Sequence, residues 1–181
     1  MKWRENIPAL KFLGIFLGVY LVGNLLYGFY VEWHYPWVDP ATSWVANQSA
    51  ALIQLFFGNV ISTMQDTVNP TVLLIENGKS ILRVYEGCNG LNVMIVFVAF
   101  IMAFGGVDKR GILFCLVGCV LIHIANLGRV ILLFVVAKNY QHYFYFIHKY
   151  LFTAILYALV FVLWWVWVAK IKRSNETTEE I

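Results

Sequence analysis

One cysteine stands where a helix is expected to begin. Cys88 lies in the segment Glu86-Gly-Cys-Asn-Gly-Leu-Asn92, directly before a run of hydrophobic residues. The unpaired N–H groups at a helix start stabilise a thiolate, which is the nucleophilic form of cysteine. Asn89 is suited to cap that helix, and the glycines around it, including Gly90, allow backbone to approach a ligand closely. The position is compatible with a nucleophile and with a buried, inert thiol.

Arg129 is a charged residue inside an apolar stretch. An arginine on a membrane helix costs roughly 2.5 to 3.5 kcal/mol at the bilayer centre and less near an interface. Eighteen residues separate it from Gly111, a rise of ~27 Å against ~30 Å of hydrocarbon, so we expect the guanidinium at the level of Cys88. His123, Asn126 and Arg129 recur every three residues, and this polar stripe favours the bundle interior over snorkelling to the membrane surface.

A base near the outer face of the membrane, beside Cys88 and Arg129, would complete a site for nucleophilic catalysis. Four histidines are candidates. His148 lies just before the last apolar stretch, at the required depth, and His142 lies in the same aromatic loop. His34 follows the first apolar stretch and suits an interfacial anchor. His123 lies about two turns deeper than Arg129 and suits a buried hydrogen bond. Depth alone favours His148 over His142.

The composition of the chain is that of an integral membrane protein. Of its 181 residues, 61% are hydrophobic and only 13% are charged, and the mean hydropathy is +0.72. So little charge could not cover a surface in water. Nucleic-acid binding is not expected, because 13 basic and 10 acidic residues give a net charge of only +3, with no basic run on a soluble face.

Three cysteines are too few and too badly placed for a disulfide scaffold or a zinc site, so we expect no metal and no cofactor. Cys115 and Cys119 lie one turn apart at the cytoplasmic start of the third apolar stretch. Packing is the simplest explanation for them, with palmitoylation or a redox role as alternatives.

Hydropathy predicts an all-α polytopic membrane protein with about four transmembrane helices. The expected spans are residues 12–31, 91–107, 112–137 and 151–169. The first span is read as an uncleaved anchor, because no small-residue cleavage site follows it. If both termini are inside, eight of the 13 basic residues lie on the cytoplasmic side, and this bias supports that topology. We therefore expect a multi-pass protein of the cytoplasmic membrane with both termini inside.

The segment between the first two spans, residues 32–90, is then external. Residues 40–57 suit an amphipathic helix on the outer interface, with a re-entrant segment as the alternative. Residues 71–86 read as a β-hairpin around a type I′ turn at Asn77-Gly78, with Glu76 opposite Lys79. The expected organisation is one membrane domain, 1–170, followed by a cytoplasmic polar tail, 171–181.

Three features together resemble the exosortase/archaeosortase family, most closely its short XrtF-like branch. They are Glu86-Gly-Cys-Asn-Gly-Leu-Asn-Val93, Ile124-Ala-Asn-Leu-Gly-Arg-Val-Ile131 and a histidine before the next span. The resemblance covers about residues 82–163 and implies a membrane-embedded cysteine transpeptidase for protein sorting to the cell envelope. Such enzymes cleave C-terminal sorting tails at the outer face of the membrane. This chain is shorter than many members, which have about eight spans.

The resemblance also implies roles for particular residues. Cys88 would be the nucleophile, and Arg129 and His148 would be the arginine and histidine of the site. Asn89, Gly90 and Asn126 would support them. The implied partners are the C-terminal tails of exported proteins, a lipid or amine acceptor and the surrounding membrane lipids. Hydrolysis and transfer to an acceptor both remain open.

Other functions fit the residues less well. A quinone-linked thiol oxidoreductase needs paired external cysteines, and only Cys88 is expected outside. A channel or transporter would need broken helices that meet at the membrane midplane, and the third span has no break beyond Gly128. A non-enzymatic scaffold or assembly subunit for envelope proteins remains as an alternative, and it predicts that Cys88 is replaceable.

Overall fold

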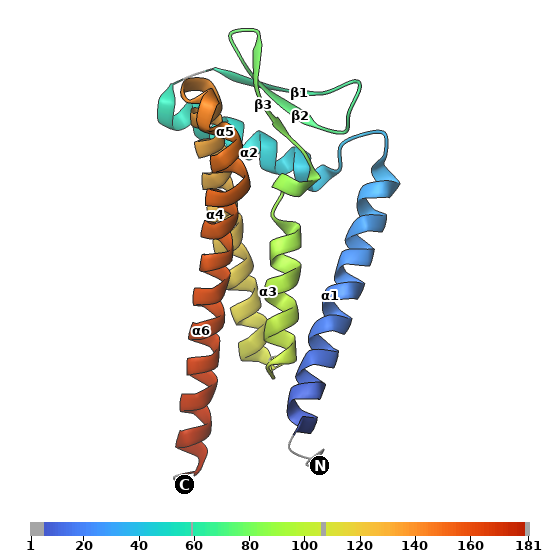
Figure 1. Ribbon diagram of the computed structural model, residues 1–181, viewed down its shortest axis with the longest axis vertical. Helices are drawn as coiled ribbons and strands as arrows, with labels where there is room; N and C mark the ends of the chain where they lie inside the picture. The colour runs from blue at the N-terminus through green and yellow to red at the C-terminus, as the bar shows by residue number, and fades with distance from the viewer. Residues whose placement is uncertain (1–5, 59, 106–107, 180–181) are drawn as a thin grey trace. The chain divides into compact units, whose positions relative to one another are not determined.

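A computed structural model describes residues 6–58, 60–105 and 108–179, with side chains through residue 170 (Figure 1). It is mainly helical, with one small antiparallel sheet. In chain order the elements are α1 (Ile7–His34), α2 (Pro40–Phe57), β1 (Ile61–Gln65), β2 (Val72–Glu76), β3 (Lys79–Val84), η2 (Glu86–Cys88), α3 (Leu91–Ala103), α4 (Lys109–Asn139), η3 (Gln141–Tyr143), α5 (Phe144–Phe146), η4 (Ile147–Leu151) and α6 (Phe152–Glu179).

Among the described residues, three helical stretches are long and apolar enough to cross a membrane: Ile7–His34, Lys109–Asn139 and Gln141–Lys170. The fold class expected from the sequence is thus confirmed. The second expected span, 91–107, is shorter than predicted, because α3 has only 13 residues. A helix of that length rises ~20 Å, less than the ~30 Å hydrocarbon layer. Residues 106 and 107 lie outside the described part of the chain.

Helix α2 has the predicted bounds, and local signals explain both ends. Asp39 caps its start, where the carboxylate accepts the N–H of Thr42 at 2.9 Å, and Pro40 occupies the first turn. Gly58 ends the helix in the left-handed conformation, with φ at 69°. The buried residues of α2 follow helical spacing, and they are Thr42, Val45, Ala46, Ser49, Ala50 and Ile53.

The predicted hairpin is present, and it belongs to a three-stranded sheet of order β1-β2-β3. Asn77 and Gly78 both have positive φ, at 51° and 76°, as a type I′ turn requires. Glu76 lies opposite Lys79, as expected. Strand β1 was not predicted, because its Ile-Ser-Thr-Met-Gln sequence alternates only weakly between apolar and polar residues. In the structure only the first of these five residues is buried.

The carboxylate of Glu76 is buried, and its ion pair comes from the end of α4 instead of from the hairpin. Lys138 Nζ lies 2.9 Å from Oε1 and 2.8 Å from Oε2 of Glu76. Loss of the partner of a buried carboxylate strongly destabilises a folded protein. This ion pair therefore holds the hairpin to the end of α4.

The chain divides into two compact units, each assembled from separated stretches and each with its own apolar core. One contains residues 1–25, 91–122 and 157–181, and the other contains 26–90 and 123–156. The core of the second unit joins side chains of α2, the sheet, α4 and α6. Cys88, Arg129 and His148 all belong to this second unit, which therefore holds the candidate site.

In the first unit, helices α3 and α4 pack closely at a glycine. A methyl group built on Gly118 would lie 2.3 Å from the ring of Phe97, which is completely buried. A side chain at position 118 would therefore force the ring or the helix to move. Gly14 in α1 offers a contrast, since nothing lies within 4 Å of the corresponding position.

We expect Gly118→Ala to destabilise the protein by about 1 to 3 kcal/mol, because the added methyl group overpacks the α3–α4 contact. Thermal unfolding of the purified protein in detergent would measure the change. Gly14→Ala is the matched control and should be neutral or stabilising, since alanine favours a helix. Equal unfolding temperatures for the two variants would contradict the packing argument.

Candidate active site

Cys88 ends the short helix η2 and is held there by its own backbone. Its N–H donates to the carbonyl of Tyr85 at 2.8 Å, and its carbonyl accepts the side-chain Nδ2 of Asn126 at 2.8 Å. Asn126 is completely buried on α4. Gly90 has a φ of 82°, and a methyl group there would lie 3.1 Å from Cγ of Asn126. A glycine is therefore needed at position 90, because a side chain there would crowd Asn126.

A second buried contact holds Asn89 between two other helices. Asn89 Nδ2 donates to the hydroxyl of Tyr27 at 2.8 Å and to Oγ1 of Thr42 at 3.1 Å. The Tyr27 hydroxyl in turn donates to the carbonyl of Glu86 at 3.0 Å. Side chains from α1, α2 and α4 therefore fix the position of residues 86–90. Buried polar groups that are paired in this way resist displacement, because each would be costly to leave unpaired.

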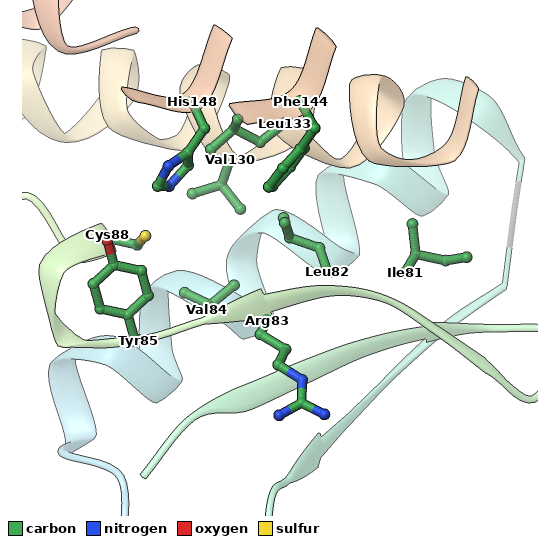
Figure 2. Close-up of a pocket in the computed structure, with 10 residues that line it drawn as sticks. All are labelled: Ile81, Leu82, Arg83, Val84, Tyr85, Cys88, Val130, Leu133, Phe144 and His148. Carbon is green, nitrogen blue, oxygen red and sulfur yellow. The ribbon is translucent and has the colours of Figure 1, made fainter. Parts of the chain in front are cut away.

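A cavity of about 320 Å³ lies beside Cys88. Figure 2 shows it between β3 on one side and the helical segments that carry Val130 and His148 on the other. Its lining is mostly apolar and consists of Ile81, Leu82, Arg83, Val84, Tyr85, Cys88, Val130, Leu133, Phe144 and His148. Cys88 and His148 thus share one cavity.

His148 lies in η4, a π-helical turn between α5 and α6. Such turns are rare and occur often at functional sites. Its ring is half-buried and stacks on Phe144, with ring centroids 5.6 Å apart and planes 15° from parallel. In Figure 2 the imidazole points across the cavity toward Cys88 and Tyr85. His142 is exposed in η3 and does not line this cavity, so of the two loop histidines the structure brings His148 to Cys88.

Arg129 does not line the cavity, but its charge acts on three groups there: the Cys88 thiol, the Tyr85 hydroxyl and the His148 ring. The side chain is partly buried, and its Nε has no hydrogen-bond partner among the described residues. A guanidinium with a free, desolvated donor is suited to bind an anion.

Sequence reasoning missed Tyr85. Its hydroxyl donates a hydrogen bond to the Cys88 side chain, and Figure 2 shows the two groups together. Tyr85 and Cys88 are three residues apart, a spacing that brings side chains together on a helical turn. The sequence alone did not show that a helical turn joins these two residues. Gly87 lets the tyrosine ring fold back, because a methyl group at position 87 would lie 2.4 Å from a ring carbon of Tyr85.

Burial raises the pKa of the Cys88 thiol above its ordinary value. The positive charge of Arg129 and the hydrogen bonds with Tyr85 act in the opposite direction and lower this pKa, but burial dominates. The sequence left a nucleophilic thiolate and a buried thiol both open, and the raised pKa favours the protonated thiol in the resting protein at neutral pH. The reason is desolvation, since Cys88 is only 3% exposed.

The contacts of His123, His34, Cys115 and Cys119 are those of residues with a structural role. His123 stacks on Trp44 and shares a 2.8 Å hydrogen bond with Gln48. His34 forms a 2.7 Å hydrogen bond with the carbonyl of Tyr30. Cys115 and Cys119 are half-buried against the core of the first unit, as packing predicts. Within the described residues, no group of three or more potential metal ligands is present.

Comparison with known proteins identifies the family. The profile of the family described as transmembrane exosortase (Exosortase_EpsH) matches residues 8–166, which is most of the chain. The chain belongs to this family. The match to transmembrane exosortases includes nearly all of α1 and the first half of α6, and so extends well beyond the motifs around Cys88 and Arg129. No curated protein and no solved structure gives a significant match.

We expect alkylation of Cys88 in the resting protein to have a pH midpoint above the ~8.5 of an ordinary thiol, because the protonated form is favoured by burial. Tyr85→Phe removes a hydrogen bond that stabilises the thiolate and should raise the midpoint further, by about half to one pH unit. Labelling with iodoacetamide, read at the Cys88 peptide by mass spectrometry, measures both values.

The control for this titration is Tyr140→Phe, which removes a hydroxyl from an exposed tyrosine. It should leave the midpoint unchanged. A native midpoint below that of an ordinary thiol would contradict the dominance of burial, and an unchanged midpoint in Tyr85→Phe would contradict the role given to its hydroxyl.

Proposed function

We propose that this exosortase is a cysteine peptidase or transpeptidase that cleaves the C-terminal sorting tails of exported proteins. The supporting observation is that Cys88 and His148 line one cavity, while the charge of Arg129 acts on both. A thiol as nucleophile, an imidazole as base and a guanidinium that stabilises negative charge can together carry out acyl transfer through a thioester.

The first step is attack of the Cys88 sulfur on the carbonyl at the cleavage site. His148 takes the thiol proton as the carbon–sulfur bond forms, because a neutral imidazole within reach of the thiol can serve as a general base. The same proton then goes to the departing amine as the carbon–nitrogen bond breaks. This transfer explains why a protonated resting thiol is compatible with activity: the base acts when substrate is present.

Arg129 stabilises negative charge in this scheme. The charge is first on the sulfur and then on the carbonyl oxygen of the tetrahedral intermediate. An oxyanion donor of this kind contributes roughly 3 to 4 kcal/mol to the transition state. The free Nε of Arg129 supports this role, because a buried donor without a partner is available to an incoming anion.

A second reaction resolves the thioester. An amine, including one carried by a lipid, attacks the acyl carbon and releases the Cys88 thiol with the processed protein attached to the acceptor. Water in the same position gives hydrolysis and a free protein. The proposed orientation has both termini on the cytoplasmic side and the site at the outer face of the cytoplasmic membrane, where exported tails are accessible.

We expect Cys88→Ala to abolish removal of the tail from a candidate substrate in the native cell, since no other group supplies the nucleophile. Arg129→Gln and His148→Ala should reduce processing by at least 100-fold, in line with the loss of an oxyanion donor or a general base. Immunoblotting for the longer, unprocessed substrate measures the effect in each strain.

His142→Ala is the matched control, because it removes a histidine of the same loop that is exposed and outside the cavity. It should process the substrate normally. Normal processing in Cys88→Ala would reject the enzymatic function and leave a non-enzymatic scaffold. A greater loss in His142→Ala than in His148→Ala would move the base to His142.

A further inference from the structure

The cavity beside Cys88 is bordered by the end of an edge strand. Five consecutive residues, 81–85, line it, and they form the end of β3 and the residue after it. A register shift between Leu74 and Ile75 interrupts the regular alternation of β3. Figure 2 shows the side chains of Ile81, Leu82 and Val84 toward the cavity and that of Arg83 away from it. β3 is an edge strand because it pairs with β2 alone.

The register of the sheet shows which backbone groups of β3 face this cavity. Glu76 and Lys79 flank the two-residue turn and form its hydrogen-bonded pair. Every second residue of β2 counted from Glu76 therefore faces β3, and the partners of these residues are Leu82 and Val84. Arg83 lies between them, so its N–H and C=O point away from β2, at the open edge of the sheet, and Arg83 is one of the residues that line the cavity.

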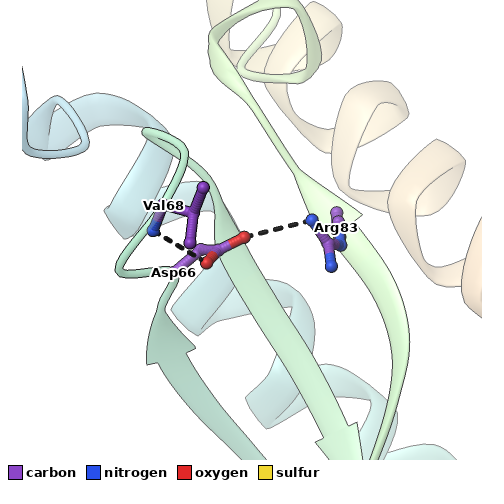
Figure 3. Close-up of polar contacts among 3 residues, drawn as sticks. All are labelled: Asp66, Val68 and Arg83. Carbon is purple, nitrogen blue, oxygen red and sulfur yellow. Dashed lines mark hydrogen bonds and ion pairs between the residues drawn. The ribbon is translucent and has the colours of Figure 1, made fainter.

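The side chain of Arg83 points away from the cavity (Figure 2) and toward Asp66 (Figure 3). Its guanidinium donates to Oδ2 of Asp66 at 3.1 Å, and Oδ1 of Asp66 accepts the N–H of Val68 at 3.1 Å. The hydrogen bond from Val68 lowers the pKa of Asp66, so the carboxylate stays charged at neutral pH. Arg83 therefore borders the cavity with its backbone.

We propose that the cavity binds the sorting tail in extended form, as a strand added to the open edge of β3. This inference rests on the proposed function, since it assigns the substrate a place in that site. An extended peptide offers N–H and C=O groups that pair with those of Arg83, and β3 runs directly into η2, which carries Cys88. A lipid chain would match the apolar lining but would leave these backbone groups unpaired.

The size of the cavity agrees with a short peptide segment. Its volume of about 320 Å³ is near the lower end of ligand pockets, which measure roughly 300 to 1,000 Å³. Residues 81–85 span ~17 Å, so an added strand would place a few substrate residues between the end of the hairpin and Cys88. The recognition motif of the tail occupies this stretch, and its scissile carbonyl reaches the sulfur.

The test compares two reagents that carry the same electrophile, on membranes that contain the full chain. Acetyl-Ala-Val-Ala chloromethyl ketone has a peptide, and chloroacetone has none. In both cases the Cys88 thiolate displaces chloride and forms a thioether, which mass spectrometry detects. We expect the peptide reagent to label faster. N-methylation of one of its amides should reduce its rate about fivefold, because one backbone hydrogen bond is lost.

The protein variants test the same contact from the other side. Arg83→Pro removes the N–H that faces the cavity, and proline is tolerated at a sheet edge. It should slow the peptide reagent about fivefold and leave chloroacetone unchanged. Arg83→Ala is the matched control, because it loses the ion pair with Asp66 but keeps the N–H, and it should react with the peptide reagent at the native rate.

The outcomes separate this inference from the proposed function. Equal rates for the two reagents, or no effect when each amide is N-methylated in turn, would overturn strand addition and favour a lipid occupant. Tail processing that still requires Cys88 in that case would leave the proposed function standing. Normal processing in Cys88→Ala would overturn the function whatever the rates of the two reagents.

Discussion

The structure of the candidate site depends on the buried hydrogen bonds that hold residues 86–90. Asn126 binds the carbonyl of Cys88, and Asn89 joins Tyr27 to Thr42. These contacts come from three helices that are distant in sequence. In a low-dielectric environment each unpaired amide or hydroxyl would carry a large desolvation cost, so the contacts form together. The sulfur is thereby held at a fixed place beside the cavity, before any substrate binds.

The same burial that fixes Cys88 also opposes its ionisation. A thiol that is almost completely buried favours the neutral form, and the charge of Arg129 with the hydroxyl of Tyr85 only partly offsets this preference. A resting thiol of this kind is protected from chance oxidation and alkylation, which require the thiolate. In the proposed mechanism, Cys88 reacts only when a base and a substrate carbonyl are within reach, so binding of the substrate both selects it and activates the thiol.

The sheet gives the site a second property. A hairpin with one open edge exposes backbone groups that can bind peptide without regard to its side chains, while alternate pockets supply specificity. Here Arg83, in the middle of that edge, is one of the residues that line the cavity, and β3 leads to η2. The ion pair between Glu76 and Lys138 holds the hairpin to α4, the helix that also carries Asn126 and Arg129. Cys88, Arg129 and the proposed peptide-binding edge are therefore positioned by one set of contacts.

The sequence by itself determined the membrane class, the helix at 40–57, the hairpin turn and the candidate residues Cys88, Arg129 and His148. These follow from hydropathy, capping and turn chemistry, which act over a few residues. Only the tertiary structure decided the pairing of β1, the partner of Glu76, the hydrogen bond from Tyr85 and the protonated state of Cys88. Each of these depends on groups far apart in sequence or on burial, and no local pattern encodes which distant side chains exclude water from a site.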